Sequence, residues 1–485
     1  MLISSEPAGG RTAVRVGHDN NGGSSDLRPM RLSGPESEFR PLTVIPGTFA
    51  VALLLFGTRW GSYIGHFPIF LTDVLIALAV GRLLFSRSRS VGSLGTVRMG
   101  LTAWAVTGFL LFVIARALLG TQALSMVWLR DLTPFLYAGL VLVGATAYAR
   151  TGPRGRVLTA RVLWWALNGH LVWTLMVNFG VIAPESMPFL PASDVTIFSQ
   201  RPDVDMAVLG MTAALYLRHL MVGRHRSLAA LGLVLCLVAV SGLESRAGLL
   251  AVLAALTTSY LLTLSAQHHA RSRLKWIVLA PVVLLVAATV VPQTEAGQRL
   301  LASAGVIEAT EQHEIDAIGT AHARDLAWDY VIDWTNDDTV RTLVGTGFGP
   351  NFIRESGAEP SLSGTAWEGV RSPHNWFIGV YARTGIIGLS FIALILLGTL
   401  YHAVRIRRSV GATDLLTLAA AGSAALLVVA AFGVVLESPF GAVPFWWFLG
   451  LLFAERHVGP TLQEDPEMTS SGVPQGGLPP VHLTP

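Results

Sequence analysis

The segment Ser372-Pro373-His374-Asn375 lies directly before a long apolar stretch and has the residue types of a reactive site. Ser372 fits a helix N-cap and Pro373 fits the first helical position, which predicts that His374 lies in the first turn of that helix. The backbone N–H groups at a helix N-terminus favour an anion and disfavour a protonated imidazole. A neutral histidine there is suited to act as a general base or a hydrogen-bond donor. It also fits an amphipathic residue at a membrane interface, and the motif alone leaves both interpretations open.

Few other groups in the chain are suited to catalysis or metal binding. Glu437, in a Leu-Glu-Ser-Pro run between two apolar segments, is a second candidate acid or base. Asn336-Asp337-Asp338 could attract a metal, but this run is more typical of a turn. We therefore expect the chemistry to centre on His374, with Glu437 as the weaker candidate.

The composition indicates a membrane protein. Of the 485 residues, 52% are hydrophobic and 13% are charged, whereas soluble domains average about 25% charged residues. The net charge of +3 is too small to indicate nucleic-acid binding. The single cysteine, Cys236, excludes a disulfide framework within the chain and a cysteine-based metal site.

Apolar stretches long enough to cross about 30 Å of hydrocarbon recur along the chain. They predict an all-α, polytopic membrane protein of about 12 transmembrane helices, with approximate spans at 41–58, 68–85, 99–118, 131–149, 158–178, 203–222, 227–243, 247–265, 275–292, 375–400, 414–435 and 442–455. Nine helices then lie within 41–292, a large loop occupies 293–373, and three helices lie within 374–456. Residues 1–40 and 457–485 are rich in Gly, Ser and Pro without apolar periodicity, so we expect disordered tails there.

Basic residues are concentrated in alternate loops. One set of loops carries pairs or triplets, namely Arg87, Arg89 and Arg98; Arg154 and Arg156; Arg224 and Arg226; Arg271, Arg273 and Lys275; and Arg405, Arg407 and Arg408. The other loops carry isolated arginines such as Arg59 and Arg130. The positive-inside rule places the first set of loops, and both tails, on the cytoplasmic side of a bacterial inner membrane. The loop 293–373 is then extracytoplasmic.

This loop should be a folded, functional unit, because a structureless loop of about 80 residues would be unusual. Residues 320–334 predict a helix on the membrane surface, with Arg324, Trp328 and Val331 on one side. Arginines on an apolar face can also be explained by snorkelling of their long side chains.

Arg201 and Arg246 lie at the outer ends of predicted spans, against the positive-inside trend. Such arginines either serve a functional anion site or anchor the chain to lipid phosphate, and the sequence leaves both open. Glu244 is two residues from Arg246, and we expect the two to form an ion pair.

The spacing around His374 resembles a known family. Nine residues separate His374-Asn375 from Gly385, and two residues separate Gly385 from Gly388. This pattern is similar to the signature of the bacterial O-antigen ligase and O-antigen polymerase superfamily. The runs Gly345-Thr346-Gly347-Phe348-Gly349, Phe198-Ser199-Gln200-Arg201 and Ser245-Arg246-Ala247-Gly248 also resemble it, so the resemblance covers roughly residues 195–400. Gly385 and Gly388 lie one turn apart and would let a neighbouring helix approach closely.

The resemblance implies a membrane glycosyltransferase that uses neither a metal nor another cofactor. Members of this superfamily move a glycan from undecaprenyl diphosphate to an acceptor on the outer membrane face. The family's histidine would fall on His374, its loop arginine on Arg324 and its earlier arginine on Arg201. Arginine forks suit a lipid diphosphate leaving group, because they bind phosphate bidentately, and Arg246 would support that cluster.

Several alternatives stay open. A ligase would attach the glycan to a lipid or a protein, whereas a repeat-unit polymerase would extend a lipid-linked glycan. A polyprenyl-linked glycan flippase, or another transporter, would use the same arginines only to bind phosphate, although we find no internal repeat of the transporter kind. The first outer loop, residues 59–67, contains no Asp or Glu, which favours the metal-independent family over metal-dependent membrane glycosyltransferases.

Overall fold

The computed structural model describes residues 45–66, 69–85, 100–120, 125–149, 151, 153–191, 193–266, 274–275, 277, 289, 291–363, 369–409 and 413–454. The two predicted tails and most of the predicted span 275–292 lie outside these residues.

Helices occupy the other predicted spans. They are α1 Ile45–Gly61, α2 Leu71–Phe85, α4 Gly100–Leu118, α5 Met126–Leu136 with η2 Tyr137–Gly139 and α6 Leu140–Ala149, α7 Pro153–Asn178, α8 Pro202–Val222, α9 Arg226–Ser241, α10 Arg246–Ala266, α17 Trp376–Ser409, α18 Asp414–Ala431 and α19 Pro439–Ala454. The strands of the described part are β1 Gly65–His66 and β2 Ile69–Phe70, which pair antiparallel with Gly65 opposite Phe70.

Five of the described helical segments have the length and apolar composition needed to cross a membrane: α4, the α5–α6 segment, α10, α17 and α18. The helices α9 and α19 are apolar but shorter. The chain is therefore an all-α membrane protein with several candidate spans. The number twelve stays a prediction.

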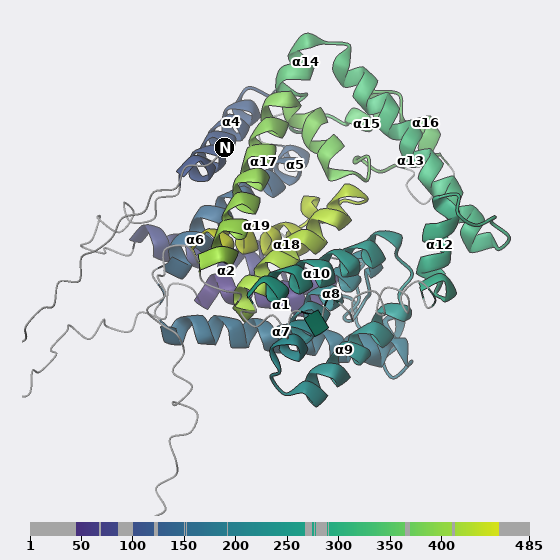
Figure 1. Cartoon of the computed structure of the whole chain (residues 1–485). Helices are drawn as coiled ribbons and strands as arrows, with labels where there is room; N and C mark the ends of the chain where they lie inside the picture. The colour runs from purple at the N-terminus through teal and green to yellow at the C-terminus, as the bar shows by residue number, and fades with distance from the viewer. Residues whose placement is uncertain are drawn as a thin grey trace, which may run out of the picture. The chain divides into compact units, whose positions relative to one another are not determined.

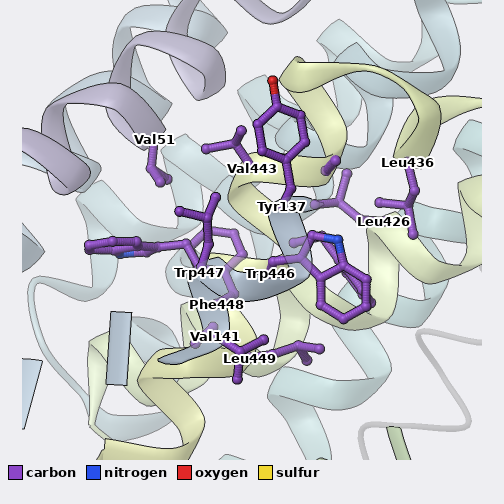
Figure 2. Close-up of a cluster of buried hydrophobic side chains, with 14 of the residues drawn as sticks. Val51, Tyr137, Val141, Leu426, Leu436, Val443, Trp446, Trp447, Phe448 and Leu449 are labelled. Carbon is purple, nitrogen blue, oxygen red and sulfur yellow. The ribbon is translucent and has the colours of Figure 1, made fainter. Parts of the chain in front are cut away.

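The core is centred on α19, which is apolar on every side and buried along its whole length. Figure 2 shows Trp446 and Trp447 of this helix among side chains from other elements, including Val51 of α1 and Leu426 of α18. Small residues allow this packing. A Cβ on Gly47 of α1 would overlap the Trp447 ring. Glycine at this position therefore leaves the space that the bulky side chain of α19 fills.

Between α10 and α17 the chain forms a series of helices, coloured green in Figure 1: η4 Val291–Gln293, α12 Glu295–Ser303, α13 Gln312–Asn336, α14 Thr339–Val344, α15 Phe352–Glu355 and α16 Glu359–Leu362. The predicted helix 320–334 lies within the longer α13. A reciprocal capping box between Glu311 and Glu314 starts α13. The predicted turn at 336–338 joins α13 to α14, and Asp338 caps α14 by accepting from the backbone N–H groups of Val340 and Arg341.

The motif glycine Gly385 interrupts α17, because its φ of 63° and ψ of −166° are not helical. A Cβ on Gly385 would overlap the backbone of Leu343 in α14. The same approach is stabilised by hydrogen bonds from Thr346 N–H to Ala382 C=O at 2.8 Å and from Gly347 N–H to Arg383 C=O at 3.0 Å. The predicted close approach is therefore found at Gly385, and its partner is the short helix α14.

We expect Gly385→Ala to destabilise the protein more than Gly388→Ala. The backbone conformation of Gly385 is essentially restricted to glycine and costs about 1–3 kcal/mol for other residues, and the clash is with backbone that cannot rotate away. A Cβ on Gly388 would instead meet the Thr384 side chain and lie 3.4 Å from the Phe112 ring. Thermal unfolding midpoints of the two variants in detergent would measure this, and equal midpoints would contradict it.

Candidate functional site

Two other elements hold the segment that leads into His374. Trp328 of α13 donates from its indole N–H to the carbonyl of Pro373 at 2.6 Å. Ser372 donates from its hydroxyl to Oε1 of Glu437, in η5 Val435–Glu437, at 2.7 Å. The two residues directly before His374 are therefore each held by a different element.

The helix begins later than predicted. Asn375 accepts from the backbone N–H groups of Phe377 at 3.0 Å and Ile378 at 3.3 Å, so it is the N-cap of α17. Ser372 instead uses its hydroxyl to bind Glu437. His374 precedes the helix, in the left-handed region with φ of 54°. Its positive φ is uncommon for residues other than glycine and indicates a position held by its surroundings.

The imidazole of His374 is half-buried, and its surroundings favour the neutral form. Burial, followed by the positive charges of Arg324 and Arg201, lowers the pKa of His374 from 6.5 to about 4. Desolvation and two guanidinium groups therefore act against protonation of His374, in place of the helix N-terminus from which the sequence predicted a neutral imidazole.

Arg201 is held at the start of α8, where it is the N-cap residue. Its backbone N–H donates to Oδ2 of Asp205 at 2.6 Å, and its Nε donates to Oδ1 of Asp203 at 3.1 Å. Asp205 is fully buried and also accepts from the hydroxyl of Thr58 at 2.6 Å. The sequence analysis missed Asp205, although a carboxylate inside a predicted span is a signal for a functional or supporting role.

Arg324 belongs to α13, and Arg246 contacts the same helix. Nη1 of Arg324 donates to the carbonyl of Phe432 at 3.1 Å, and Nη1 of Arg246 donates to the carbonyl of Ala317 at 3.0 Å. Burial, together with the charge of Arg246, lowers the pKa of Arg324 to about 10. Arg324 therefore stays protonated at neutral pH. Arg201 and Arg324 thus lie near His374, Arg246 lies near Arg324, and Asp203 pairs with Arg201; we call the three guanidinium groups the arginine cluster.

The expected ion pair between Glu244 and Arg246 is wrong. Glu244 accepts from Nη2 of Arg299 at 2.9 Å, and Arg299 also pairs with Glu295. The guanidinium of Arg246 points to α13 instead. Arg246 is thereby positioned by neutral oxygens, so its charge is not cancelled by the nearest acid in the sequence.

A cavity of about 520 Å³ opens next to His374. Its lining comes from the loop after α1, from α5, from the segment before α17, from α17 itself and from the η5–α19 turn: Tyr63, Arg130, Asp131, Pro134, Phe135, Gly369, Val370, Arg371, Ser372, His374, Trp376, Gly379, Val380, Arg383, Val434, Glu437, Ser438 and Pro439. The members of the arginine cluster are not among these lining residues. His374 is therefore shared by the cavity and the cluster.

Asp131 organises the charged wall of this cavity. Its carboxylate lies 2.9 Å from Nη1 of Arg383 and 3.3 Å from Nη2 of Arg371, and the side chains of Asp131 and Arg383 are 4% and 7% exposed. Sequence reasoning missed these groups, because α5, α17 and the loop before α17 are far apart in the chain. Charged residues within predicted spans were the available signal.

Glu437 is enclosed in the same wall. Burial raises the pKa of Glu437, against the opposing effects of the Ser372 hydrogen bond and the Arg383 charge. A Cβ on Gly379 would lie 3.1 Å from Oε1 of Glu437, so a larger residue there would press on the carboxyl group. Glu437 thus connects the cavity to the segment that carries His374.

Within the described residues, no group of three or more His, Cys, Asp or Glu side chains is arranged to hold a metal ion. Among the described residues, guanidinium groups near His374 come from the cavity lining and from the arginine cluster outside it.

Residues 231–393 match the family model described as O-Antigen ligase. The match spans about a third of the chain and includes Arg246, Arg324, His374 and both motif glycines. It confirms the resemblance to the O-antigen ligase and polymerase superfamily. No curated protein matches the chain.

Proposed function

We propose that this protein, whose residues 231–393 match the O-Antigen ligase family model, transfers a glycan from undecaprenyl diphosphate to an acceptor hydroxyl during surface polysaccharide assembly. The reaction takes place on the outer face of the bacterial inner membrane. The observation that carries the proposal is the position of His374, which lines a cavity of about 520 Å³ and lies near Arg324 and Arg201, whose charges act with burial to lower its pKa. A base and an anion site side by side are what this transfer needs.

In the proposed reaction, Arg201 and Arg324 bind the diphosphate bidentately and Arg246 supports them. The acceptor hydroxyl attacks the anomeric carbon, and His374 takes up the hydroxyl proton as the new C–O bond forms. The bond from the anomeric carbon to the diphosphate oxygen breaks, and the electron pair leaves with undecaprenyl diphosphate. A single displacement of this kind inverts the anomeric configuration.

Glu437 is the second proposed acid–base group. It lines the same cavity as His374, and burial raises its pKa from the ordinary value of a glutamate. In this role Glu437 binds an acceptor oxygen while it also holds Ser372. Asn375 and Gly385 contribute indirectly: Asn375 caps α17, and Gly385 admits α14 beside it.

The acceptor is a glycan, a lipid or a protein, and the reaction is that of a ligase or of a repeat-unit polymerase. A flippase or another transporter is the competing function, because the arginine cluster would equally bind the phosphates of a lipid carrier during transport. The two classes differ in outcome, since only the enzyme breaks the bond between glycan and carrier. No nucleic acid is involved in either case.

We expect purified protein to release undecaprenyl diphosphate from a lipid-linked glycan in the presence of acceptor, and to do so equally well in EDTA. Guanidinium groups supply the positive charge at the leaving group, so no divalent ion is required. Chromatography of the lipid products would measure the release. Loss in EDTA with rescue by magnesium would contradict metal independence, and intact carrier on both sides of a vesicle membrane would favour the flippase.

A further inference from the structure

The cavity and the arginine cluster occupy different places beside His374, and this separation indicates which substrate each one binds. His374 lines the cavity, whereas Arg201 and Arg324 lower the pKa of His374 from outside that lining. In a direct displacement the attacking oxygen and the leaving oxygen lie on opposite sides of the anomeric carbon. If the arginine cluster holds the leaving diphosphate, the cavity is the space from which the acceptor attacks. This step rests on the proposed function.

The cavity has a surplus of positive charge. It is lined by three guanidinium groups, those of Arg130, Arg371 and Arg383, and by two carboxyl groups, those of Asp131 and Glu437. Even with both acids ionised the balance is positive, and burial of Glu437 shifts it further in that direction. Neutral sugars need no such surplus, because hydroxyl groups are bound by neutral and ionised partners alike.

Arg130 is the guanidinium best placed to meet a ligand. Arg371 and Arg383 lie within 3.3 Å of Asp131, whereas Arg130 approaches it only to 3.9 Å and is 67% exposed. Among the described residues we find no hydrogen bond from the Arg130 side chain. Its planar fork therefore has donors available for a carboxylate or phosphate.

The remaining lining suits a saccharide. Tyr63 and Trp376 supply aromatic surface, and Val370 and Val380 supply apolar surface, among the few charged groups. A volume of about 520 Å³ lies within the ~300–1,000 Å³ of small-molecule sites and accommodates a sugar ring with a substituent. We propose that this cavity is the acceptor site and that it selects an acidic saccharide, whose carboxylate or phosphate binds Arg130 while its hydroxyl faces His374.

Binding of small probes to the full-length protein in detergent tests this assignment without any transfer reaction. Isothermal titration would compare methyl glucuronide, glucose 6-phosphate and the neutral methyl glucoside. We expect both acidic probes to bind in the millimolar range or tighter, and the neutral probe to bind at least ~10-fold more weakly. Arg130→Gln should remove that preference, whereas Arg354→Gln, at an exposed arginine of α15 outside the cavity, should keep it.

A second titration, with farnesyl diphosphate as a donor probe, separates the cavity from the arginine cluster. We expect saturating farnesyl diphosphate to leave methyl glucuronide binding intact, and Arg130→Gln to leave farnesyl diphosphate binding intact. Equal binding of acidic and neutral probes, or no binding of any saccharide, would overturn the proposed selectivity. Competition between farnesyl diphosphate and methyl glucuronide would show that the cavity holds the donor phosphates. Failure of glycan transfer with intact saccharide binding would count against the proposed function alone.

Discussion

His374→Ala should lower the rate of glycan transfer about 10²–10⁴-fold, the range for loss of a general acid–base group. The side chain is half-buried at the edge of a cavity, so its removal should cost little packing. The segment keeps its hydrogen bonds to Trp328 and Glu437, because these use the carbonyl of Pro373 and the hydroxyl of Ser372. Steady-state rates, with the thermal unfolding midpoint as a check on folding, would measure the effect.

His374→Gln separates a base from an orienting group. Glutamine keeps hydrogen-bonding capacity but takes up no proton near neutral pH. If His374 is the base, the glutamine variant should be nearly as slow as the alanine variant. If it only orients the acceptor, much of the activity should remain. A well-folded His374→Ala protein that transfers glycan at the wild-type rate would exclude both roles.

The pH dependence follows from the lowered pKa of His374. The neutral imidazole is the basic form, so kcat/KM for the free protein should stay level from neutral pH to ~pH 5 and fall as pH drops through about 4. A bound diphosphate stabilises the imidazolium and raises this pKa, so the fall in kcat should occur at higher pH than the fall in kcat/KM. Activity regained at neutral pH after acid exposure would exclude irreversible unfolding as the cause, and the glutamine variant should lack this titration.

Some of the site was predictable because short motifs carry it. His374 and Asn375 are adjacent, and Gly385 follows at a fixed distance, so one segment reveals them together. Arg324 could be predicted for a similar reason, because it lies on a helix whose apolar face is periodic. The hydrogen bonds of the segment around His374 were harder to predict. The hydroxyl of Ser372 binds Glu437 instead of capping the helix, and only the tertiary structure brings that carboxylate close.

The cavity could not be predicted, because its charged wall is assembled from distant segments. Asp131 lies about 240 residues from Arg371 and about 250 from Arg383 in the sequence, so no local pattern links the three. Burying a charged side chain costs free energy, and the structure shows how that cost is offset here: Asp131 forms ion pairs with both arginines. The error at Glu244 has the same origin, since proximity in sequence suggested Arg246 while the fold offered Arg299.

Arg324→Ala should lower kcat/KM for the lipid-linked donor about 10²–10³-fold, as expected when a preorganised donor to a developing charge is lost. The half-buried side chain of Arg324 is already oriented by its hydrogen bond to the Phe432 carbonyl. Arg324→Lys keeps the charge but loses the planar fork, and should therefore lose most of the activity as well. Donor titrations at saturating acceptor would measure both variants.

Arg341→Lys provides the matched control for this substitution. Arg341 lies in α14 and stacks on Trp334 with 4.3 Å from Cζ to the ring centroid, and it is not part of the arginine cluster. If the lysine substitution acted only through lost packing of a guanidinium in this region, Arg341→Lys and Arg324→Lys should impair transfer alike. If Arg324 binds the diphosphate, only its lysine variant should weaken donor use. Near-normal transfer by both Arg324 variants would leave this residue as an anchor of α13 to Phe432, and the diphosphate would then depend on Arg201 and Arg246.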